Sequence, residues 1–113
     1  MLERPAAGER AVVVQLDFGE DDVAEQLEEV RLLTESAGAV VCAEVYGRRQ
    51  SPDAATYAGK GKVQEVAAEV AANTADLVIF NHALSPAQER NLERILQPYV
   101  ENLISIGIDA RLR

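Results

Sequence analysis

Two glycines and two lysines alternate over residues 59–62, and this spacing suits the binding of an anion. Gly59 and Gly61 allow the backbone to adopt positive φ and to approach a partner closely. Lys60 and Lys62 supply positive charge, and the apolar spacing that follows predicts a helix whose N-terminal N–H groups face the same loop. Phosphate is the usual anion at such a place. This loop, with Tyr57 just before it, is the first candidate for a phosphate, RNA or nucleotide contact.

The same loop resembles half of a Walker A motif but does not complete it. The motif places Gly five residues before its Gly-Lys pair, where this chain has Thr56. It also places Ser or Thr after the lysine to bind magnesium, where this chain has Val63. We therefore expect no phosphate-loop NTPase chemistry here. A phosphate contact and a plain surface loop remain as alternatives.

Charge is spread unevenly over the 113 residues, whose net charge is −8. Eight acidic residues and one arginine lie between positions 17 and 35, whereas four basic residues and one aspartate lie between 48 and 62. The overall balance argues against a free-standing nucleic-acid binder, because neutralising phosphates requires surplus lysine and arginine. Arg48 and Arg49 nevertheless join the loop lysines in a local basic stretch. The low aromatic content, 4%, argues against a broad base-stacking surface.

No catalytic or metal-binding set of residues is recognisable. His82 is the single histidine, and as a general base it would need a second acid, for which Asp17 is the obvious candidate. We expect the simpler role, a hydrogen bond in the turn after a strand. Cys42 lies in an apolar run and is expected to pack in the core, without a disulfide or a metal. The chain alone is expected not to be an enzyme.

The elements that must position these residues alternate between strands and helices. Apolar runs and helical spacing predict strands at 11–18, 39–46, 76–80 and, more weakly, 102–106, and helices at 23–37, 62–72 and 86–97. This alternation predicts an α/β fold, an open, mostly parallel sheet of three to four strands with helices on both faces. Residues 1–10 are expected to form a flexible lead-in and residues 11–113 a single domain.

Several residues mark the expected helix ends. Gly38 is placed to end the first helix. Ser85 and Gln88, with a proline at the first helical position, predict a capping box for the third helix. Ser51 and Pro52 predict one short helical turn in the long connection after the second strand.

In open α/β sheets, ligands bind beyond the carboxyl ends of the strands. The residues that follow predicted strand ends are Asp17, Gly19, Gly47, Arg48, Asn81 and His82. The glycine-lysine loop should lie at the same edge, because its helix must run antiparallel to the strands. Asn81 and His82 are therefore candidate contacts beside the loop.

Two segments form a specific combination. Residues 53–65 read DAATYAGKGKVQE, and residues 78–93 read VIFNHALSPAQERNLE. Together they resemble the N-terminal domain of the HflX family of ribosome-associated GTPases, over roughly residues 10–97. The resemblance implies binding of the large ribosomal subunit and its rRNA and dissociation of stalled ribosomes under stress. It also implies GTP hydrolysis, with GTP and Mg²⁺ bound in a separate G domain, and ATP binding outside that domain.

The chain departs from the family pattern in two respects. It contains no G domain, so we expect neither GTP hydrolysis nor a bound cofactor in these residues. After Gln97 its sequence differs from the strand usual in the family, which leaves the fourth strand and residues 98–113 open.

Three functions therefore remain. The leading one is a ribosome-recognition module that contacts rRNA through the two arginines and two lysines. The second is a nucleotide site, for ATP, on the same loop, and the third is a structural module that positions a G domain. Because no signal peptide or membrane-spanning run is recognisable, we expect a cytoplasmic protein. If the fourth strand is weak or missing, we also expect weak homodimers through the edge of the third strand.

Overall fold

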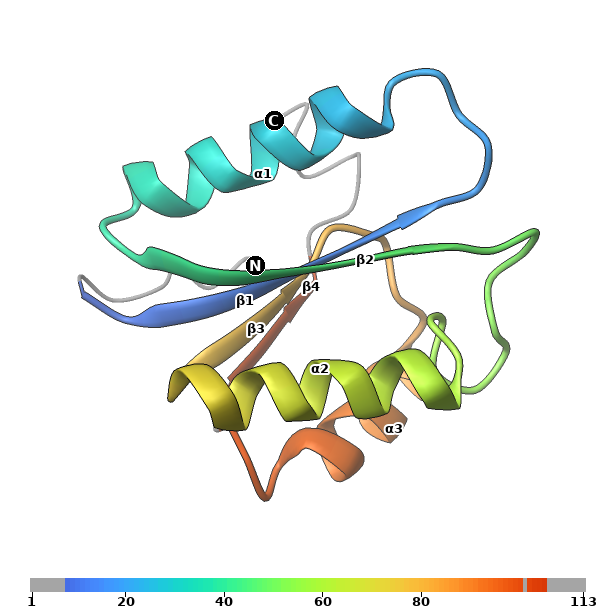
Figure 1. The fold of residues 1–113 in the computed structure, drawn as a ribbon. Helices are drawn as coiled ribbons and strands as arrows, with labels where there is room; N and C mark the ends of the chain where they lie inside the picture. Colours follow the sequence, from blue (N-terminus) through green and yellow to red (C-terminus); the bar gives the residue numbers. More distant parts are fainter. Residues whose placement is uncertain (1–7, 101, 106–113) are drawn as a thin grey trace.

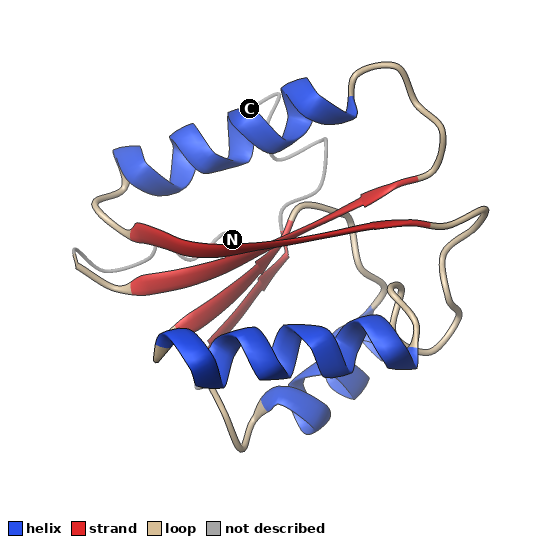
Figure 2. Cartoon of the chain, in the orientation of Figure 1, coloured by secondary structure: helices blue, strands red, loops and turns tan. Residues whose placement is uncertain are grey.

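The computed structural model describes residues 8–100 and 102–105 and shows alternating strands and helices (Figure 2). Along the chain the elements are β1 (Arg10–Asp17), α1 (Val23–Ser36), β2 (Val40–Arg48), α2 (Lys60–Asn73), β3 (Leu77–Phe80), α3 (Pro86–Leu96) and β4 (Asn102–Ser105). The predicted α/β fold is confirmed, and the weakly predicted fourth strand is present.

The strands form one open parallel sheet in the order β2-β1-β3-β4. α1 covers one face of the sheet, and α2 and α3 cover the other (Figure 1). The connection through α1 leads from β1 to β2 on one side. The connection through α2 then returns past β1 to β3 on the other side. Open α/β sheets have a ligand-binding crevice where consecutive connections diverge in this way, here outside the ends of β1 and β3.

Burial explains the sequences of the strands. Residues 11–14 of β1 and all of β3 are at most 1% exposed, which accounts for their continuous apolar runs. β2 is an edge strand, and its Val40 and Tyr46 are each 47% exposed. A register shift opposite Ala11 and Val12 leaves Cys42 as the extra residue of a bulge. Cys42 is therefore half-buried rather than fully enclosed, and burial raises the pKa of its thiol.

The predicted helix ends are confirmed at both α1 and α3. Gly38 follows α1 with a φ of 92°, in the left-handed region that glycine tolerates. At α3 the Ser85 hydroxyl accepts a hydrogen bond from the Gln88 N–H (3.1 Å), and the Gln88 side chain accepts one from the Ser85 N–H (2.9 Å). This capping box fixes where the chain turns after β3.

Three expectations about the connection after β2 are wrong. β2 continues to Arg48 because its end still pairs with β1. α2 begins at Lys60, so the second glycine and both lysines lie in its first turn. Residues 51–52 start no helical turn. The chain instead forms an isolated antiparallel bridge between Asp53 and Tyr57.

Among the described residues, the sheet has an edge strand on each side, β2 and β4. β4 pairs with the whole of β3, so the expected homodimer through the edge of β3 loses its basis. At the N-terminus, Arg10 already belongs to β1 and the Gly8 N–H donates to the Gly38 carbonyl (2.8 Å). The rest of the predicted lead-in, residues 1–7, lies outside the described residues.

Candidate functional site

The candidate site lies at the carboxyl edge of the sheet. The name carboxyl edge is used for the loops that follow β1, β2 and β3. These three strands end at Asp17, Arg48 and Phe80. α2 begins at the same edge, because the Lys62 ammonium donates to the Tyr46 carbonyl (3.0 Å) and Arg49 Nη1 donates to the Ala58 carbonyl (3.2 Å). The structure thus brings the end of β2 and the glycine-lysine segment together.

Three aromatic side chains occupy the crevice between the ends of β1 and β3. Phe18 follows β1, His82 follows β3, and Tyr57 comes from the loop before α2. The Tyr57 and His82 rings stack with centroids 4.9 Å apart, and Phe18 meets them edge-on at 5.7 and 5.8 Å. Tyr57 has a φ of 69°, which is uncommon for a residue other than glycine. The usual ligand position of such a sheet is thus taken by the chain's own side chains.

His82 and Asn81 fasten the loop after β3. The Leu16 N–H donates to His82 Nε2 (2.8 Å), so this nitrogen carries no proton. The predicted hydrogen-bonding role of His82 is confirmed, although this partner lies on β1 and not in the turn. Asn81 is 2% exposed and donates to the Gln15 side chain (2.5 Å) and the Gln26 carbonyl (3.1 Å). Asn81 therefore joins β3, β1 and α1 instead of facing a partner at the surface.

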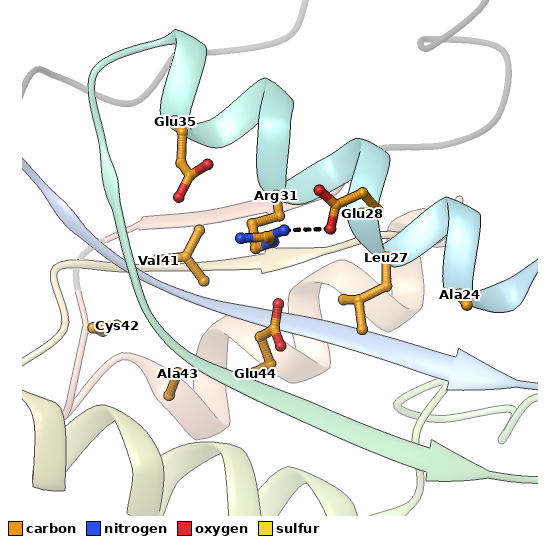
Figure 3. Close-up of a pocket in the computed structure, with 9 residues that line it drawn as sticks. All are labelled: Ala24, Leu27, Glu28, Arg31, Glu35, Val41, Cys42, Ala43 and Glu44. Atoms are coloured by element: carbon orange, nitrogen blue, oxygen red, sulfur yellow. Dashed lines mark hydrogen bonds and ion pairs between the residues drawn. The ribbon is translucent and has the colours of Figure 1, made fainter.

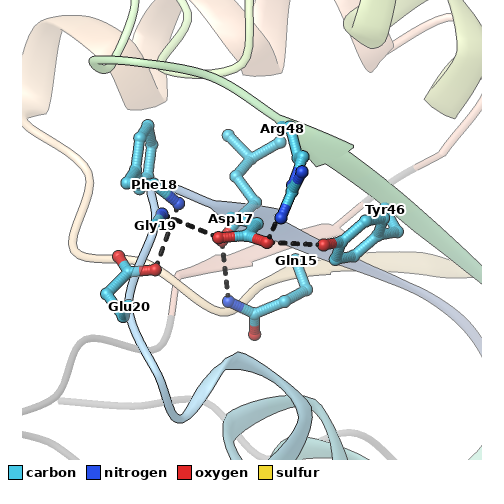
Figure 4. Close-up of polar contacts among 8 residues, drawn as sticks. Gln15, Asp17, Phe18, Gly19, Glu20, Tyr46 and Arg48 are labelled. Atoms are coloured by element: carbon cyan, nitrogen blue, oxygen red, sulfur yellow. Dashed lines mark hydrogen bonds and ion pairs between the residues drawn. The ribbon is translucent and has the colours of Figure 1, made fainter.

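Asp17 is the acidic centre of the edge (Figure 4). Its Oδ2 accepts hydrogen bonds from the Tyr46 hydroxyl (2.7 Å) and Arg48 Nε (3.3 Å), and its Oδ1 accepts one from the Gly19 N–H (2.7 Å). The Tyr46 hydroxyl, followed by the Gly19 N–H, holds the pKa of Asp17 below its usual value. In turn, the carboxylate raises the pKa of Tyr46. Asp17 is thus an ionised anchor for the end of β2.

The long loop before α2 is held by its own aspartate and by α3. Asp53 Oδ1 accepts hydrogen bonds from the N–H groups of Ala55 (2.9 Å) and Thr56 (2.8 Å), and these bonds lower the pKa of Asp53. From α3, Gln88 donates to the Asp53 carbonyl (2.9 Å) and Asn91 donates to the Ala55 carbonyl (2.8 Å). The two segments of the sequence motif are therefore in direct contact.

Gly59 and Arg49 form the inner brace of the loop. Gly59 has φ 88° and ψ 155°, a combination accessible only to glycine. A Cβ atom at this position would lie 2.5 Å from Arg49 Nη1. Arg49 donates to the carbonyls of Ser51 (3.0 Å) and Ala58 (3.2 Å). Its guanidinium therefore links the first residues of the loop to the residues directly before α2.

Lys62 is also engaged within the chain. Its ammonium lies 2.9 Å from the Glu65 carboxylate and donates to the Tyr46 carbonyl. A Cβ at Gly47 would lie 2.6 Å from Lys62 Cε, so the side chain lies across the β2 backbone. The lysine thereby links α2 to the end of β2 with its charge balanced.

Arg48 and Lys60 are the cations of the segment that face solvent. The Arg48 side chain is 82% exposed, although its Nε contacts Asp17. Lys60 is exposed at the start of α2 and forms no ion pair with the described residues. Next to Arg48 an open hollow of about 380 Å³ is lined by Asp17, Phe18, Gly19, Arg48, Arg49 and Gln50. The exposed Arg48 can bind an anion beside this hollow, whereas the Asp17 carboxylate that lines the hollow would repel one.

Three residues of this edge were missed by sequence reasoning. The sequence predicts Phe18 as the end of a strand, whereas β1 ends at Asp17 and Phe18 begins the loop, as its position directly before Gly19 indicates. Gln88 was recognised only as a cap, and Asn91 only as part of a motif. Gly61 was recognised, but it is exposed with open space around it and approaches nothing closely.

The described residues, 8–100 and 102–105, offer no group of three or more His, Cys, Asp or Glu side chains that could hold a metal ion. Within the same ranges, no helix has the length and apolar character needed to cross a membrane.

Residues 24–103 match the protein family described as GTP-binding GTPase N-terminal. The chain belongs to this family. GTPase HflX of Escherichia coli (strain K12) is 44% identical over 109 residues, which are 96% of this chain and 26% of that protein. GTPase HflX of Caldanaerobacter subterraneus subsp. tengcongensis is 38% identical over 101 residues, 89% of this chain and 23% of that protein. This HflX-type N-terminal chain spans about a quarter of the length of the curated relatives it matches.

A solved structure, described as "crystal structure of SsGBP and GDP complex", has the same fold. It aligns with a TM-score of 0.56 at 20% identity, covering 84% of this chain and 26% of that chain. At this identity the likeness supports the α/β fold alone.

Proposed function

We propose that this chain is the rRNA-recognition module of an HflX-type GTPase that binds the large ribosomal subunit and helps to dissociate stalled ribosomes. GTP hydrolysis, with its GTP and Mg²⁺, belongs in this proposal to a separate G domain of a cytoplasmic protein active under stress. Membership of the N-terminal GTPase family supports it, as does the small share of each GTPase relative that the chain covers.

The observation that carries the proposal is the pair of exposed cations at the carboxyl edge. Arg48 projects into solvent from the end of β2, and Lys60 projects from the first turn of α2. N–H groups at a helix N-terminus attract anions, so an RNA phosphate placed here meets the helix and a cation together. Lys62 and Arg49 contribute indirectly, since their hydrogen bonds to backbone carbonyls hold the segment in shape.

The test replaces only the exposed cations. The variant Arg48→Gln with Lys60→Gln is compared with Arg90→Gln with Arg94→Gln, which removes two exposed cations from α3 and changes net charge equally. Binding to purified large ribosomal subunits is measured against salt concentration. Each lost phosphate contact should reduce the slope of log affinity against log salt by about 0.7–0.9, so the first variant should lose about 1.5.

The control variant should keep the wild-type slope. Equal slopes for all three proteins would refute the phosphate contact. An equal loss of slope in both variants would also refute it, because a general charge effect lowers both alike. Circular dichroism spectra of the variants establish that each remains folded.

A nucleotide site is the second candidate, and the hollow beside Arg48 favours it. Its volume of about 380 Å³ lies in the range of small-molecule pockets. The Asp17 carboxylate in its wall would repel a phosphate group, so a nucleotide would have to place its base or sugar there. Titration calorimetry with ATP and with GTP tests this. Saturable binding that Asp17→Asn alters supports the nucleotide site, and no heat with either nucleotide refutes it.

A further inference from the structure

A groove runs between α1 and the open edge of β2 (Figure 3). Its volume is about 500 Å³, and its lining residues are Ala24, Leu27, Glu28, Arg31 and Glu35 from α1 and Val41, Cys42, Ala43 and Glu44 from β2. The α1 residues recur at helical spacing and form a single stripe. The β2 residues are consecutive, and the extra residue of the bulge, Cys42, is among them.

The shape of the groove suits an extended chain. From Ala24 to Glu35 the α1 stripe is about 16 Å long, which is the length of about five residues of a strand. Among the described residues β2 pairs with β1 alone, so alternate backbone N–H and C=O groups of β2 face away from the sheet. An extended peptide lying in the groove can reach these groups and add to the sheet edge.

The chemistry of the groove is apolar at the floor and acidic at the rim. Leu27 and Val41 are partly buried hydrophobic residues packed against the core. Glu28, Glu35 and Glu44 are exposed around them. Arg31 is the single cation of the lining, and it is already hydrogen-bonded to the Glu28 carboxylate. The lining therefore carries an excess of two negative charges.

The negative charge of the lining distinguishes between the possible binding partners of the groove. A second copy of the chain would place the same carboxylates opposite themselves across a two-fold axis, because an isologous interface pairs a patch with itself. An RNA strand would be repelled as well, because its phosphates carry the same negative charge as the carboxylates of the lining. A basic peptide with aliphatic residues complements both the acidic rim and the apolar floor of the groove.

We propose that the groove between α1 and β2 binds an extended basic segment of a protein partner. Aliphatic side chains of the segment contact Leu27 and Val41. Its lysine or arginine side chains pair with Glu35 and Glu44. This surface is separate from the carboxyl edge, so the inference stands apart from rRNA recognition.

The experiment titrates the isotope-labelled chain with the synthetic peptide Lys-Val-Lys-Val-Lys-Val and, in parallel, with Glu-Val-Glu-Val-Glu-Val. NMR shift changes locate the binding surface. We expect the basic peptide to shift the signals of Val41 to Glu44 and of the facing α1 stripe, and the acidic peptide to shift none. Glu44→Lys should weaken binding by about fivefold or more. Ala24→Trp, which fills the groove from an exposed position, should weaken it similarly.

The matched control is Glu93→Lys, an equal charge change at an exposed site on α3, which covers the other face of the sheet. It should leave the affinity within about twofold. No binding below about 1 mM, equal weakening by Glu93→Lys, or shifts centred on the carboxyl edge would each overturn the proposal. So would self-association through β2 in sedimentation, or an RNA oligonucleotide that competes for the groove.

Discussion

Gly59 and Gly61 look alike in the sequence but should respond in opposite ways to the same substitution. Gly59→Ala places a methyl group 2.5 Å from Arg49 Nη1 and forces alanine to a φ of 88°. The backbone strain costs about 1–3 kcal/mol. Displacing Arg49 removes its hydrogen bond to the Ala58 carbonyl, which is worth about 1 kcal/mol. The free energy of unfolding should therefore fall by about 2–4 kcal/mol, and Tm by about 10 °C.

Gly61→Ala is the control within the same segment. Gly61 lies in the first turn of α2, and a Cβ there meets nothing within 4 Å. Alanine should raise the free energy of unfolding by about 0.5 kcal/mol, because it restricts the unfolded chain and favours helix. Urea denaturation followed by circular dichroism measures both variants, and equal effects would refute the proposed geometry.

A double variant separates the two causes at Gly59. Arg49→Ala alone should cost about 2 kcal/mol, because it removes two hydrogen bonds to the loop that are each worth about 1 kcal/mol. In the presence of Arg49→Ala, Gly59→Ala should cost less than in the wild type, because the clash has gone and the backbone strain remains. Strict additivity would show that Arg49 does not contact the Gly59 position.

Three further outcomes follow from the contacts around the carboxyl edge. Ser85→Ala removes the hydroxyl cap of α3 and should lower the free energy of unfolding by about 1 kcal/mol in urea titrations. His82→Phe retains a ring but leaves the buried Leu16 N–H without this acceptor, so it should cost about 1–3 kcal/mol, and hydrogen exchange at Leu16 should accelerate. The pKa of Asp17 is lowered in the folded state, so its contribution to stability is present above its usual pKa of 3.8 and is lost as pH falls through the folded value. Wild type should therefore lose its advantage over Tyr46→Phe on acidification, as urea titrations at neutral and acidic pH would report.

The fold was predictable because its signals are local or periodic. The buried apolar runs of β1 and β3 and the capping box at Ser85 each depend on a few neighbouring residues. The fourth strand was predicted only weakly, because its pairing with β3 depends on contacts between distant parts of the chain. The start of α2 was placed two residues late, because Gly61 was assigned to the loop although its backbone is helical.

The candidate site was predictable in composition but not in geometry. The strand ends do gather Asp17, Arg48 and the lysine segment at one edge. Nothing in the order of residues indicated that Tyr57 adopts positive φ and stacks on His82. That arrangement arises from three loops that meet only in the folded protein.

The difference between Lys60 and Lys62 shows that the cations of one basic segment can have different structural roles. A loop that turns sharply through glycine leaves backbone carbonyls unpaired, and long cationic side chains nearby are the donors available to satisfy them. Arg49 does so at Ser51 and Ala58, and Lys62 donates in the same way to the Tyr46 carbonyl on the edge strand β2. Lys62→Gln should therefore lower the free energy of unfolding and leave the salt slope of the proposed ribosome binding close to wild type. Lys60→Gln should lower the salt slope and leave the free energy of unfolding close to wild type. If both variants changed the salt slope equally and neither changed stability, the structural role assigned to Lys62, which links α2 to the end of β2, would be wrong.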